Sequence, residues 1–198
     1  MRNIMHELKT PITKGRIIVE MLEDEQSKKV LVRAFERMNE LITELAQIER
    51  VTTQSFEPSL EYTSFKEVIQ RTRELLINES EHMCIEVDDG ALITDVNLLA
   101  LALKNLMDNG IKYSIDKHVC LRSVENGLEV VSQGKALQHP LSYYLEPFSQ
   151  EEKRSSGFGL GLYIVNAILE KLGYMLDYRY EEGNNIFAII TQKHCSIK

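Results

Sequence analysis

The stretch GFGLGLYIV, residues 157–165, places three glycines at alternating positions directly before an apolar run that predicts a helix. Such glycines leave backbone N–H groups bare, and the helix dipole adds positive potential, so the junction favours an anion such as phosphate. It is neither a Walker A loop, since no Gly-Lys-Ser/Thr follows, nor the dinucleotide fingerprint, since Leu162 takes the third glycine's place and no strand leads in. We therefore expect Gly157, Gly159 and Gly161 to form a phosphate site of another kind.

A second polar feature lies on the helix expected over residues 95–113. At about 100° per residue, the apolar residues of this helix gather on one side, and Asn105, Asp108, Asn109 and Lys112 gather roughly opposite. Asparagine oxygens suit hard cations, and Mg²⁺ takes only one or two protein ligands because it keeps its waters and its phosphates. These residues predict an Mg²⁺–phosphate site, although an ordinary solvated helix face would have the same pattern.

From about residue 60, the chain alternates short strands with helices. The expected helices are 64–78, 95–113 and 160–172, and the expected strands are 84–87, 91–94, 119–124, 128–132, 175–180 and 186–191. Strand pairs joined by short turns, including the last pair with its turn in EEGNN, predict a mixed sheet with helices on one face. This part of the chain is expected to be an α/β sandwich.

The segment 136–156 between the fourth strand and the last helix is too long and polar for a plain connector. Segments of this kind are often lids over a binding site, so a lid over the phosphates is expected here, with a surface loop as the alternative. In the lid interpretation, Lys153 or Arg154 adds positive charge beside the phosphates.

Two helices are expected before the sandwich. Apolar residues spaced by three and four form a stripe from Ile4 to Leu22, and a broader stripe runs along a helix over 29–54. Because so broad a stripe needs more than one partner, we expect two such hairpins to form a four-helix bundle in a homodimer. Packing against the rest of its own chain is the alternative. The polar stretch TTQSFEPS then divides an α+β chain into a hairpin, residues 1–56, and a sandwich, residues 60–198.

The stretch HELKTP, residues 6–11, lies in the first of these helices. His6 falls about 200° from Ile4, away from the apolar stripe, and Thr10 stacks beside it one turn later. Pro11 cannot donate to the carbonyl of Glu7, so a bend is expected just after the histidine. His6 is therefore displayed, although a lone histidine of this kind is more often an ordinary surface residue.

Composition excludes several classes of function. A net charge of -7, without a cluster of lysines and arginines, argues against nucleic-acid binding. No apolar run approaches the roughly 18 to 20 residues that cross a bilayer, so no membrane contact by the chain itself is expected. Cys84, Cys120 and Cys195 lie far apart, without a Cys-x-x-Cys pair or ligand spacing to histidine. They indicate idle thiols in a reducing compartment and argue against zinc.

Together these stretches resemble the cytoplasmic part of the sensor histidine kinases of two-component systems. HELKTP is similar to the H box of this family, NLMDNGIKYS (105–114) to its N box, EPF (146–148) to its F box, and GFGLGL (157–162) to its G2 box. The resemblance covers nearly the whole chain and implies a dimerising hairpin followed by an ATP-binding sandwich of the GHKL ATPase type. It also implies a cytoplasmic location, as the cytosolic part of an inner-membrane sensor protein.

For the hairpin, the resemblance implies that ATP with Mg²⁺ phosphorylates His6 and that the phosphoryl group passes to an aspartate of a response regulator receiver domain. Glu7 beside the histidine can hold the proton of the second imidazole nitrogen and stabilise the developing positive charge. Glu7 and Thr10, which match the family's Glu-x-x-Thr pattern, would place a water for dephosphorylation of the regulator. The same face would then serve a kinase step and a phosphatase step.

For the sandwich, the resemblance implies a nucleotide site made by the N box and the G2 box. Asn105 would lie near the γ-phosphate, Asn109 would hold Mg²⁺, and Tyr113 would lie along the nucleotide. Lys112 and the amides of 157–161 would neutralise phosphate charge, which is most of what phosphoryl transfer requires besides positioning.

One motif departs from the family's pattern. The G1 motif, Asp-x-Gly-x-Gly, falls on SQGKA, residues 132–136, where Ser132 stands for the adenine-binding aspartate and Ala136 for the second glycine. Gly134 is retained. Two interpretations stay open: an active kinase, or a phosphoacceptor and phosphatase module that binds nucleotide weakly. A GHKL protein that phosphorylates serine is a more distant alternative, which the displayed His6 disfavours.

Overall fold

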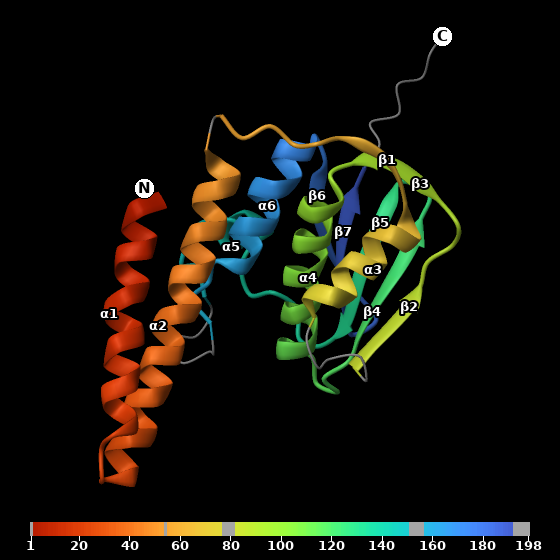
Figure 1. Cartoon of the computed structure of the whole chain (residues 1–198). Coiled ribbons are helices and arrows are strands. Elements are labelled where there is room, and N and C mark those ends of the chain that lie inside the picture. The colour runs from red at the N-terminus through yellow and green to blue at the C-terminus, as the bar shows by residue number, and fades with distance from the viewer. Residues whose placement is uncertain (1, 54, 77–81, 151–156, 192–198) are drawn as a thin grey trace. The chain divides into compact units, whose positions relative to one another are not determined.

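The computed structural model describes residues 2–53, 55–76, 82–150 and 157–191, and the side chains of residues 2–7 lie outside this description. The chain divides into two compact units, Met1–Thr53 and Gln54–Lys198. The first unit contains helices α1 and α2, and the second contains the remaining helices and all the described strands (Figure 1).

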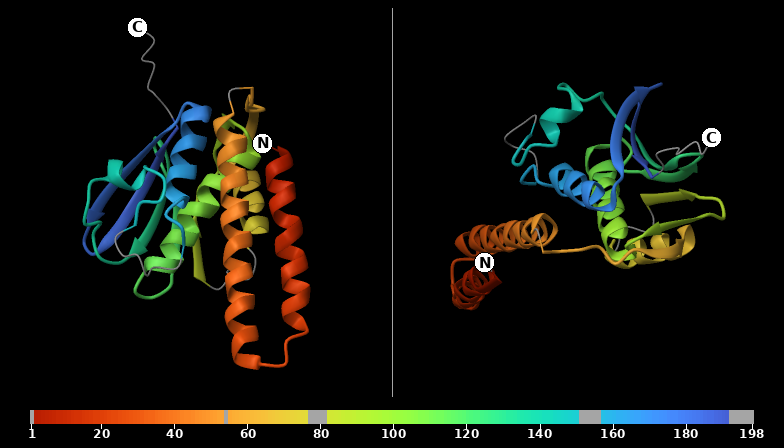
Figure 2. Two further views of the ribbon diagram at one scale, coloured as in Figure 1. Left: turned by 90° about the vertical axis from the view of Figure 1, so that its left-hand side faces the viewer. Right: turned by 90° about the horizontal axis from the view of Figure 1, so that it is seen from above.

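The first unit is an antiparallel helical hairpin of α1 (Arg2–Glu20) and α2 (Glu25–Thr52) (Figure 2). Asp24 caps α2, because its carboxylate accepts a hydrogen bond from the backbone N–H of Ser27 at 2.9 Å. Across the turn, Lys28 Nζ donates to the carbonyl of Glu20 at 3.0 Å and lies 3.1 Å from its carboxylate. Helix α1 continues through Pro11 without a break.

The contacts within the hairpin use only one edge of the apolar stripe of α1. Val19 is buried, and Gly15 lies so close to the ring of Phe35 that no side chain would fit between them. Leu8 and Ile18, of the same stripe, are 43% and 64% exposed. One hairpin therefore leaves the other edge of its stripe uncovered, which is the surface that a second hairpin would need; the homodimer itself stays a prediction.

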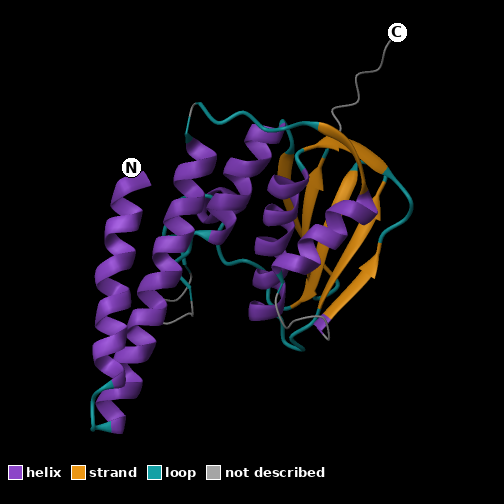
Figure 3. Ribbon diagram, viewed as in Figure 1, coloured by secondary structure: helices purple, strands orange, loops and turns teal. Residues whose placement is uncertain are grey.

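The second unit is an α/β sandwich. Its five-stranded sheet has the order β2-β4-β5-β7-β6. Strand β2 (Met83–Glu86) pairs in parallel with β4 (Val119–Val124), and antiparallel pairs then join β4 to β5 (Gly127–Gln133), β5 to β7 (Asn184–Ile190), and β7 to β6 (Met175–Glu181). Helices α3 (Phe65–Leu75), α4 (Val96–Tyr113) and α6 (Gly161–Leu172) lie against one face of the sheet (Figure 3). The expected mixed sheet with helices on one face is confirmed.

Two short elements were not expected from the sequence. Strand β1 (Glu61–Ser64) pairs antiparallel with β3 (Ala91–Thr94) in a separate two-stranded sheet, and α5 (Leu141–Tyr144) is a single turn inside the segment 136–156. The sequence predicted one mixed sheet that includes the strands now labelled β2 and β3, whereas β3 belongs to the separate two-stranded sheet. Of the residues of β1, only Thr63 is buried, so the strand lacks the apolar alternation that reveals a strand in sequence.

Helix α4 forms the centre of the core and fixes the position of the N box. Asp95 caps it by accepting hydrogen bonds from the N–H groups of Asn97 and Leu98 at 3.0 and 3.1 Å. Its other carboxylate oxygen accepts from the N–H of Ser59 at 3.0 Å, which ties the start of the unit to the helix. The largest fully buried side chains of α4 are Leu99, Leu103, Leu106 and Met107.

Candidate nucleotide site

The polar residues predicted to share one face of α4 are partly or fully withdrawn from solvent. Asn105 is only 9% exposed, and within the described part of the chain its Nδ2 has no hydrogen-bond partner. Asn109 and Lys112 are half-buried. Asp108 is engaged by Lys104, whose Nζ lies 2.5 Å from its carboxylate. Buried polar groups are nearly always hydrogen-bonded, so a buried amide with an unused donor indicates that a bound ligand or water supplies the acceptor.

The glycines of GFGLGL make room for two of these side chains. A β-carbon on Gly161 would lie 3.3 Å from Nδ2 and 3.6 Å from Oδ1 of Asn109. A β-carbon on Gly157 would lie 2.5 Å from Nζ of Lys112. Bare backbone, an amide oxygen and an ammonium group therefore come together where α6 begins. The N-cap residue, Leu160, makes no side-chain cap hydrogen bond, so within the described residues the first N–H groups of α6 can face an anion.

The F-box segment lies against the same loop. Gly159 has a φ of +70°, and a β-carbon on it would come within 2.5 Å of the carbonyl oxygen of Ser149 and 2.8 Å of the carbonyl carbon of Phe148. Gln150 Nε2 donates to the carbonyl of Gly157 at 3.0 Å. The described part of the segment 136–156 therefore contacts the glycine loop directly. Lys153 and Arg154 lie outside the described residues.

The altered G1 segment runs beside the last turns of α4. A β-carbon on Gly110 would lie 3.5 Å from Cβ of Ser132, which is buried on β5. A β-carbon on Gly134 would lie 3.5 Å from the carbonyl oxygen of Tyr113. The ring of Tyr113 is 57% exposed, and Lys112 Nζ lies 4.8 Å from its centroid. The N box and the G1 segment are therefore neighbours in space.

Asn185 is a residue of this region that the sequence did not reveal, because EEGNN was taken as a turn. It belongs to β7 and is the register partner of Ser132. The hydroxyl of Tyr178 donates to Asn185 Oδ1 at 2.8 Å and accepts from the N–H of Leu137 at 3.0 Å. Continuing the alternation of β7 back from Ile189 would have placed Asn185 on the helix-covered face.

The predicted site residues thus fall into two groups. Those of the second unit converge around the C-terminal half of α4: Asn105, Asn109, Lys112, Tyr113, Ser132, Gly134, Gly157, Gly159 and Gly161. His6, Glu7 and Thr10 lie on α1 of the first unit, where Thr10 is exposed. The side chains of His6 and Glu7 lie outside the described residues.

The donor set of the second unit suits a nucleotide with Mg²⁺. An amide oxygen from Asn109 matches the hard ligands of Mg²⁺, which keeps most of its coordination for waters and phosphates. Lys112 and the start of α6 offer positive charge and free N–H groups. The unused donor of Asn105 offers one more hydrogen bond to an anion.

Two family matches cover most of the chain. Residues 94–193 match the family described as "Histidine kinase-, DNA gyrase B-, and HSP90-like ATPase", and residues 1–54 match the "His Kinase A (phospho-acceptor) domain". Among the described residues, no helix combines the length and the apolar character needed to cross a membrane.

Similar proteins and structures agree with these matches. Sensor histidine kinase ArsS of Helicobacter pylori is 39% identical over 96% of this chain and 45% of its own length. Sensor histidine kinase GraS of Staphylococcus haemolyticus is 25% identical over 94% of this chain and 58% of its own length. The chain thus spans about half the length of these relatives.

Solved structures share the fold. Histidine kinase AdeS of Acinetobacter baumannii matches with a TM-score of 0.67 at 24% identity, over 93% of this chain and 95% of that one. Full-length ShkA in complex with AMPPNP matches with a TM-score of 0.72 at 19% identity, over 96% of this chain and 45% of that one.

Proposed function

This chain belongs to the family of histidine kinase-, DNA gyrase B- and HSP90-like ATPases, and from that membership we propose that it is the catalytic part of a two-component sensor histidine kinase. ATP is the phosphoryl donor, His6 the first acceptor, and an aspartate of a response regulator receiver domain the second. The observation that carries the proposal is the convergence of Asn109 and Lys112 with the glycine loop at the start of α6.

In the proposed reaction, residues of the second unit bind and orient the triphosphate. The ammonium group of Lys112 and the free N–H groups at the start of α6 neutralise phosphate oxygens, and the unused amide donor of Asn105 meets another. Asn109 would hold Mg²⁺. The ion, when bound, supplies charge neutralisation along the phosphates. These contacts place the γ-phosphorus for in-line attack, which is most of the catalysis in phosphoryl transfer.

The first unit supplies the nucleophile in this proposal. The lone pair of one imidazole nitrogen of His6 forms a bond to the γ-phosphorus, while the bond from that phosphorus to the bridging oxygen breaks and ADP leaves. Glu7 holds the proton on the other nitrogen and stabilises the imidazolium that forms. An aspartate carboxylate of the regulator then takes the phosphoryl group, and His6 returns to its neutral state.

We also assign Thr10, on the exposed surface of α1, to the dephosphorylation of the regulator. Its hydroxyl would orient a water toward the acyl phosphate. Thr10→Ala should therefore leave labelling of His6 intact and slow the loss of phosphate from the regulator. Thr13→Ala is the matched control, because Thr13 is an exposed threonine of the same helix that is not assigned to this step. Equal phosphatase rates in the Thr10 variant and the parent would remove Thr10 from this role.

The partners of the first unit follow from its open apolar surface. Ile17 on α1 and Met21 directly after it are 61% and 79% exposed, on the side where helical spacing predicts His6, so we assign them to docking of the regulator. The uncovered edge with Leu8 and Ile18 is assigned to the homodimer. The length of the relatives supports the further proposal that this is the cytosolic part of a longer inner-membrane sensor.

The second candidate function is a phosphoacceptor and phosphatase module that binds nucleotide weakly. It is favoured by Ser132, a buried neutral group where the family has an aspartate.

One experiment separates the candidates: incubation of the chain with radiolabelled ATP and Mg²⁺, followed by acid or alkali. Label that survives alkali and is lost in acid supports the kinase, label that survives acid and is lost in alkali indicates phosphoserine, and absence of label favours the weak module.

A further inference from the structure

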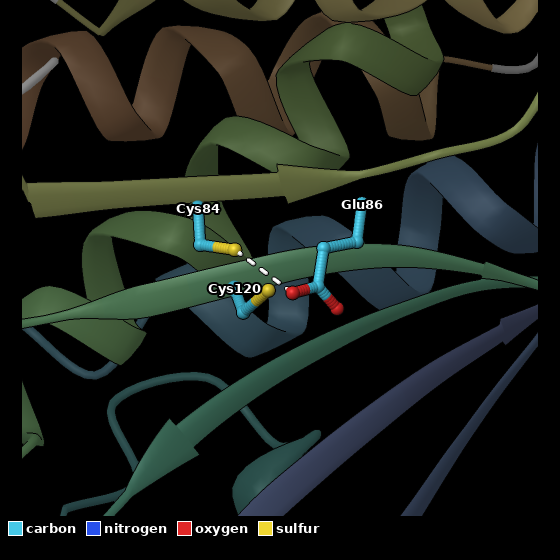
Figure 4. A group of neighbouring side chains, drawn as sticks. All are labelled: Cys84, Glu86 and Cys120. Carbon is cyan, nitrogen blue, oxygen red and sulfur yellow. Dashed lines mark hydrogen bonds between the residues drawn. The ribbon is translucent and has the colours of Figure 1, made fainter.

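Three side chains with metal-binding atoms meet on the sheet although they lie far apart in the sequence. Cys84 on β2 and Cys120 on β4 are register partners, and Glu86 follows Cys84 by two residues, so all three point to one side of the sheet. Figure 4 shows the two sulfurs and the carboxylate of Glu86 directed toward one another. One ligand atom from each residue lies within 4.8 Å of the other two, and Cys84 Sγ donates to Glu86 Oε1 at 3.4 Å.

We propose that Cys84, Glu86 and Cys120 form a binding site for a thiophilic divalent cation, with Zn²⁺ as the representative ion. Zn²⁺ binds thiolate sulfur at about 2.3 Å and carboxylate oxygen at about 2.1 Å, so two sulfurs on a tetrahedral ion are about 3.8 Å apart. The present separations are compatible with that geometry after small side-chain rotations. Three protein ligands leave the fourth position to water.

The proposed site is separate from the nucleotide site. Val119 and Leu121, which flank Cys120 on β4, are buried, and Val119 packs against Gly110 of α4. Because successive side chains of a strand alternate between its two faces, Cys120 points to the opposite face of the sheet from α4. Neither the N box nor the glycine loop lies on that face, so the ion would not compete with ATP for ligands.

Charge and access both suit a cation. Cys84 and Glu86 are exposed and Cys120 is half-buried, so an ion reaches the cluster from solvent. Among the described residues, Arg122, the register partner of Glu86, is a nearby positive charge, and Glu129 offsets it: Arg122 Nη2 and Nε lie 2.7 and 2.8 Å from the Glu129 carboxylate. Two thiolates and one carboxylate therefore outweigh the local positive charge once a metal has displaced the thiol protons.

The carboxylate distinguishes a metal site from a simple thiol pair. Two cysteines that are register partners could instead join as a disulfide, and that bond would need no carboxylate beside it. The spacing of the cysteines along the chain argued against zinc. Sequence spacing does not reveal the parallel pairing of β2 with β4, which brings Cys84 and Cys120 together.

An ion at this site would also stabilise the edge of the sheet. Strand β2 is at the end of the strand order, and its ladder with β4 covers only Met83–Glu86. A cation that binds ligands from both strands adds a second link between them. If the ion binds the folded chain more tightly than the unfolded chain, it raises the midpoint of thermal unfolding, and the rise grows with the logarithm of the free ion concentration above the dissociation constant.

The test is a titration of the whole, fully reduced chain with Zn²⁺ and, separately, with Co²⁺. We expect one ion per chain, a Co²⁺ spectrum with thiolate charge-transfer absorption, and a higher unfolding midpoint with Zn²⁺ but not with Mg²⁺. Cys84→Ser and Cys120→Ser should each weaken Zn²⁺ binding by at least about 10- to 100-fold. Mutation of a residue that only hydrogen-bonds a metal ligand already causes a loss of that size, and loss of a ligand itself should cost no less. Glu86→Gln, which keeps the shape and removes the charge, should weaken it less.

Cys195→Ser is the matched control, because it removes a cysteine that is not among the proposed ligands; binding should be unchanged. Three results would overturn the proposal. One is the absence of bound Zn²⁺ in the reduced parent. Another is binding that Cys195→Ser removes while Cys84→Ser and Cys120→Ser leave it intact. The third is a Cys84–Cys120 disulfide in the chain purified without reductant, together with no Zn²⁺ uptake after reduction.

Discussion

The ammonium group of Lys112 fills the space that a side chain on Gly157 would take, since a β-carbon there would lie 2.5 Å from Nζ. These two residues belong to different sequence motifs, one at the end of α4 and one in the glycine loop before α6. Gly157 also has a φ of +136°, which side chains rarely allow. Position 157 therefore requires glycine for two reasons: its backbone has a positive φ, and the ammonium group of Lys112 occupies the space of a side chain.

Gly157→Ala should weaken ATP binding strongly, because it displaces Lys112 as well as straining the loop. We expect a loss of about 10-fold or more, comparable with the 1.5 to 3 kcal/mol of a hydrogen bond to a charged group. Calorimetric titration with a non-hydrolysable ATP analogue measures it. Gly173→Ala is the control, because Gly173 has a φ of +73° but no atom within 4 Å of its would-be β-carbon. It should cost about 1 kcal/mol of stability and leave ATP affinity unchanged; equal losses of ATP affinity in the two variants would contradict the role of Lys112.

Asn109→Ala should remove the Mg²⁺-dependent part of nucleotide binding. The amide of Asn109 lies beside Gly161 at the start of α6 and would supply an oxygen ligand to the ion. Titrations of the nucleotide with and without Mg²⁺ should therefore differ in the parent and coincide in the variant. Asn166→Ala serves as control, since the Asn166 amide donates to Glu170 at 2.8 Å on α6. If nucleotide binding by Asn109→Ala still depends on Mg²⁺, Asn109 is not a ligand of the ion and belongs to an ordinary solvated helix face.

Ser132→Asp should tighten ATP binding by about an order of magnitude and sharpen discrimination against GTP. A carboxylate accepts from the adenine amino group and repels the carbonyl of guanine, whereas a hydroxyl can donate to that carbonyl. Because Ser132 is buried, the new charge should also lower the stability of the nucleotide-free chain. Calorimetry with ATP and GTP analogues decides the point. If neither affinity changes, Ser132 does not contact the base, and its register partner Asn185 becomes the residue to vary.

Glu129→Gln should destabilise the chain in a pH-dependent manner. Burial by itself raises the pKa of Glu129, but hydrogen bonds from Arg179 and Arg122 outweigh it and hold the pKa below its usual range. A lowered pKa means that the ionised form contributes stability above about pH 5, and that this contribution is lost as the pH falls through the folded-state pKa. Both arginines are partly exposed, so the loss near pH 7 should be only about 1 to 3 kcal/mol.

Denaturant unfolding of the Glu129 variant and the parent at several pH values gives this difference. It should be largest near neutral pH and shrink in acid. Glu74→Gln, which breaks the exposed ion pair with Arg71, is the control and should change stability much less, because solvent screens that pair. A difference between Glu129→Gln and the parent that stays constant from pH 7 to pH 3 would contradict the charge explanation.

The sequence revealed the longer elements because their periodicity extends over several turns or strand pairs. The helices expected over 95–113 and 160–172 became α4 at Val96–Tyr113 and α6 at Gly161–Leu172, and the strand expected over 119–124 is β4. Their ends carry local chemistry, such as the cap by Asp95 and the left-handed Gly173 after α6. Local signals of this kind can be found without knowing the fold.

Non-local pairing could not be found in this way. The parallel pairing of β2 with β4, the separate pairing of β1 with β3, and the approach of Asn185 to Ser132 all depend on how distant segments meet. The same limit hid the cluster of Cys84, Glu86 and Cys120. For the nucleotide site, motif order identified the residues, but only the fold revealed that Lys112 needs a glycine at 157.

The most direct test of the central claim is the site of labelling. After incubation with radiolabelled ATP and Mg²⁺, the parent and a His118→Gln variant, in which an exposed histidine of the second unit is replaced, should carry equal amounts of acid-labile, alkali-stable phosphate. His6→Gln should carry none and should still elute as a dimer, since helical spacing in the sequence predicts that His6 points away from the apolar stripe. Undiminished labelling of His6→Gln would contradict the assignment of His6 as the phosphoacceptor.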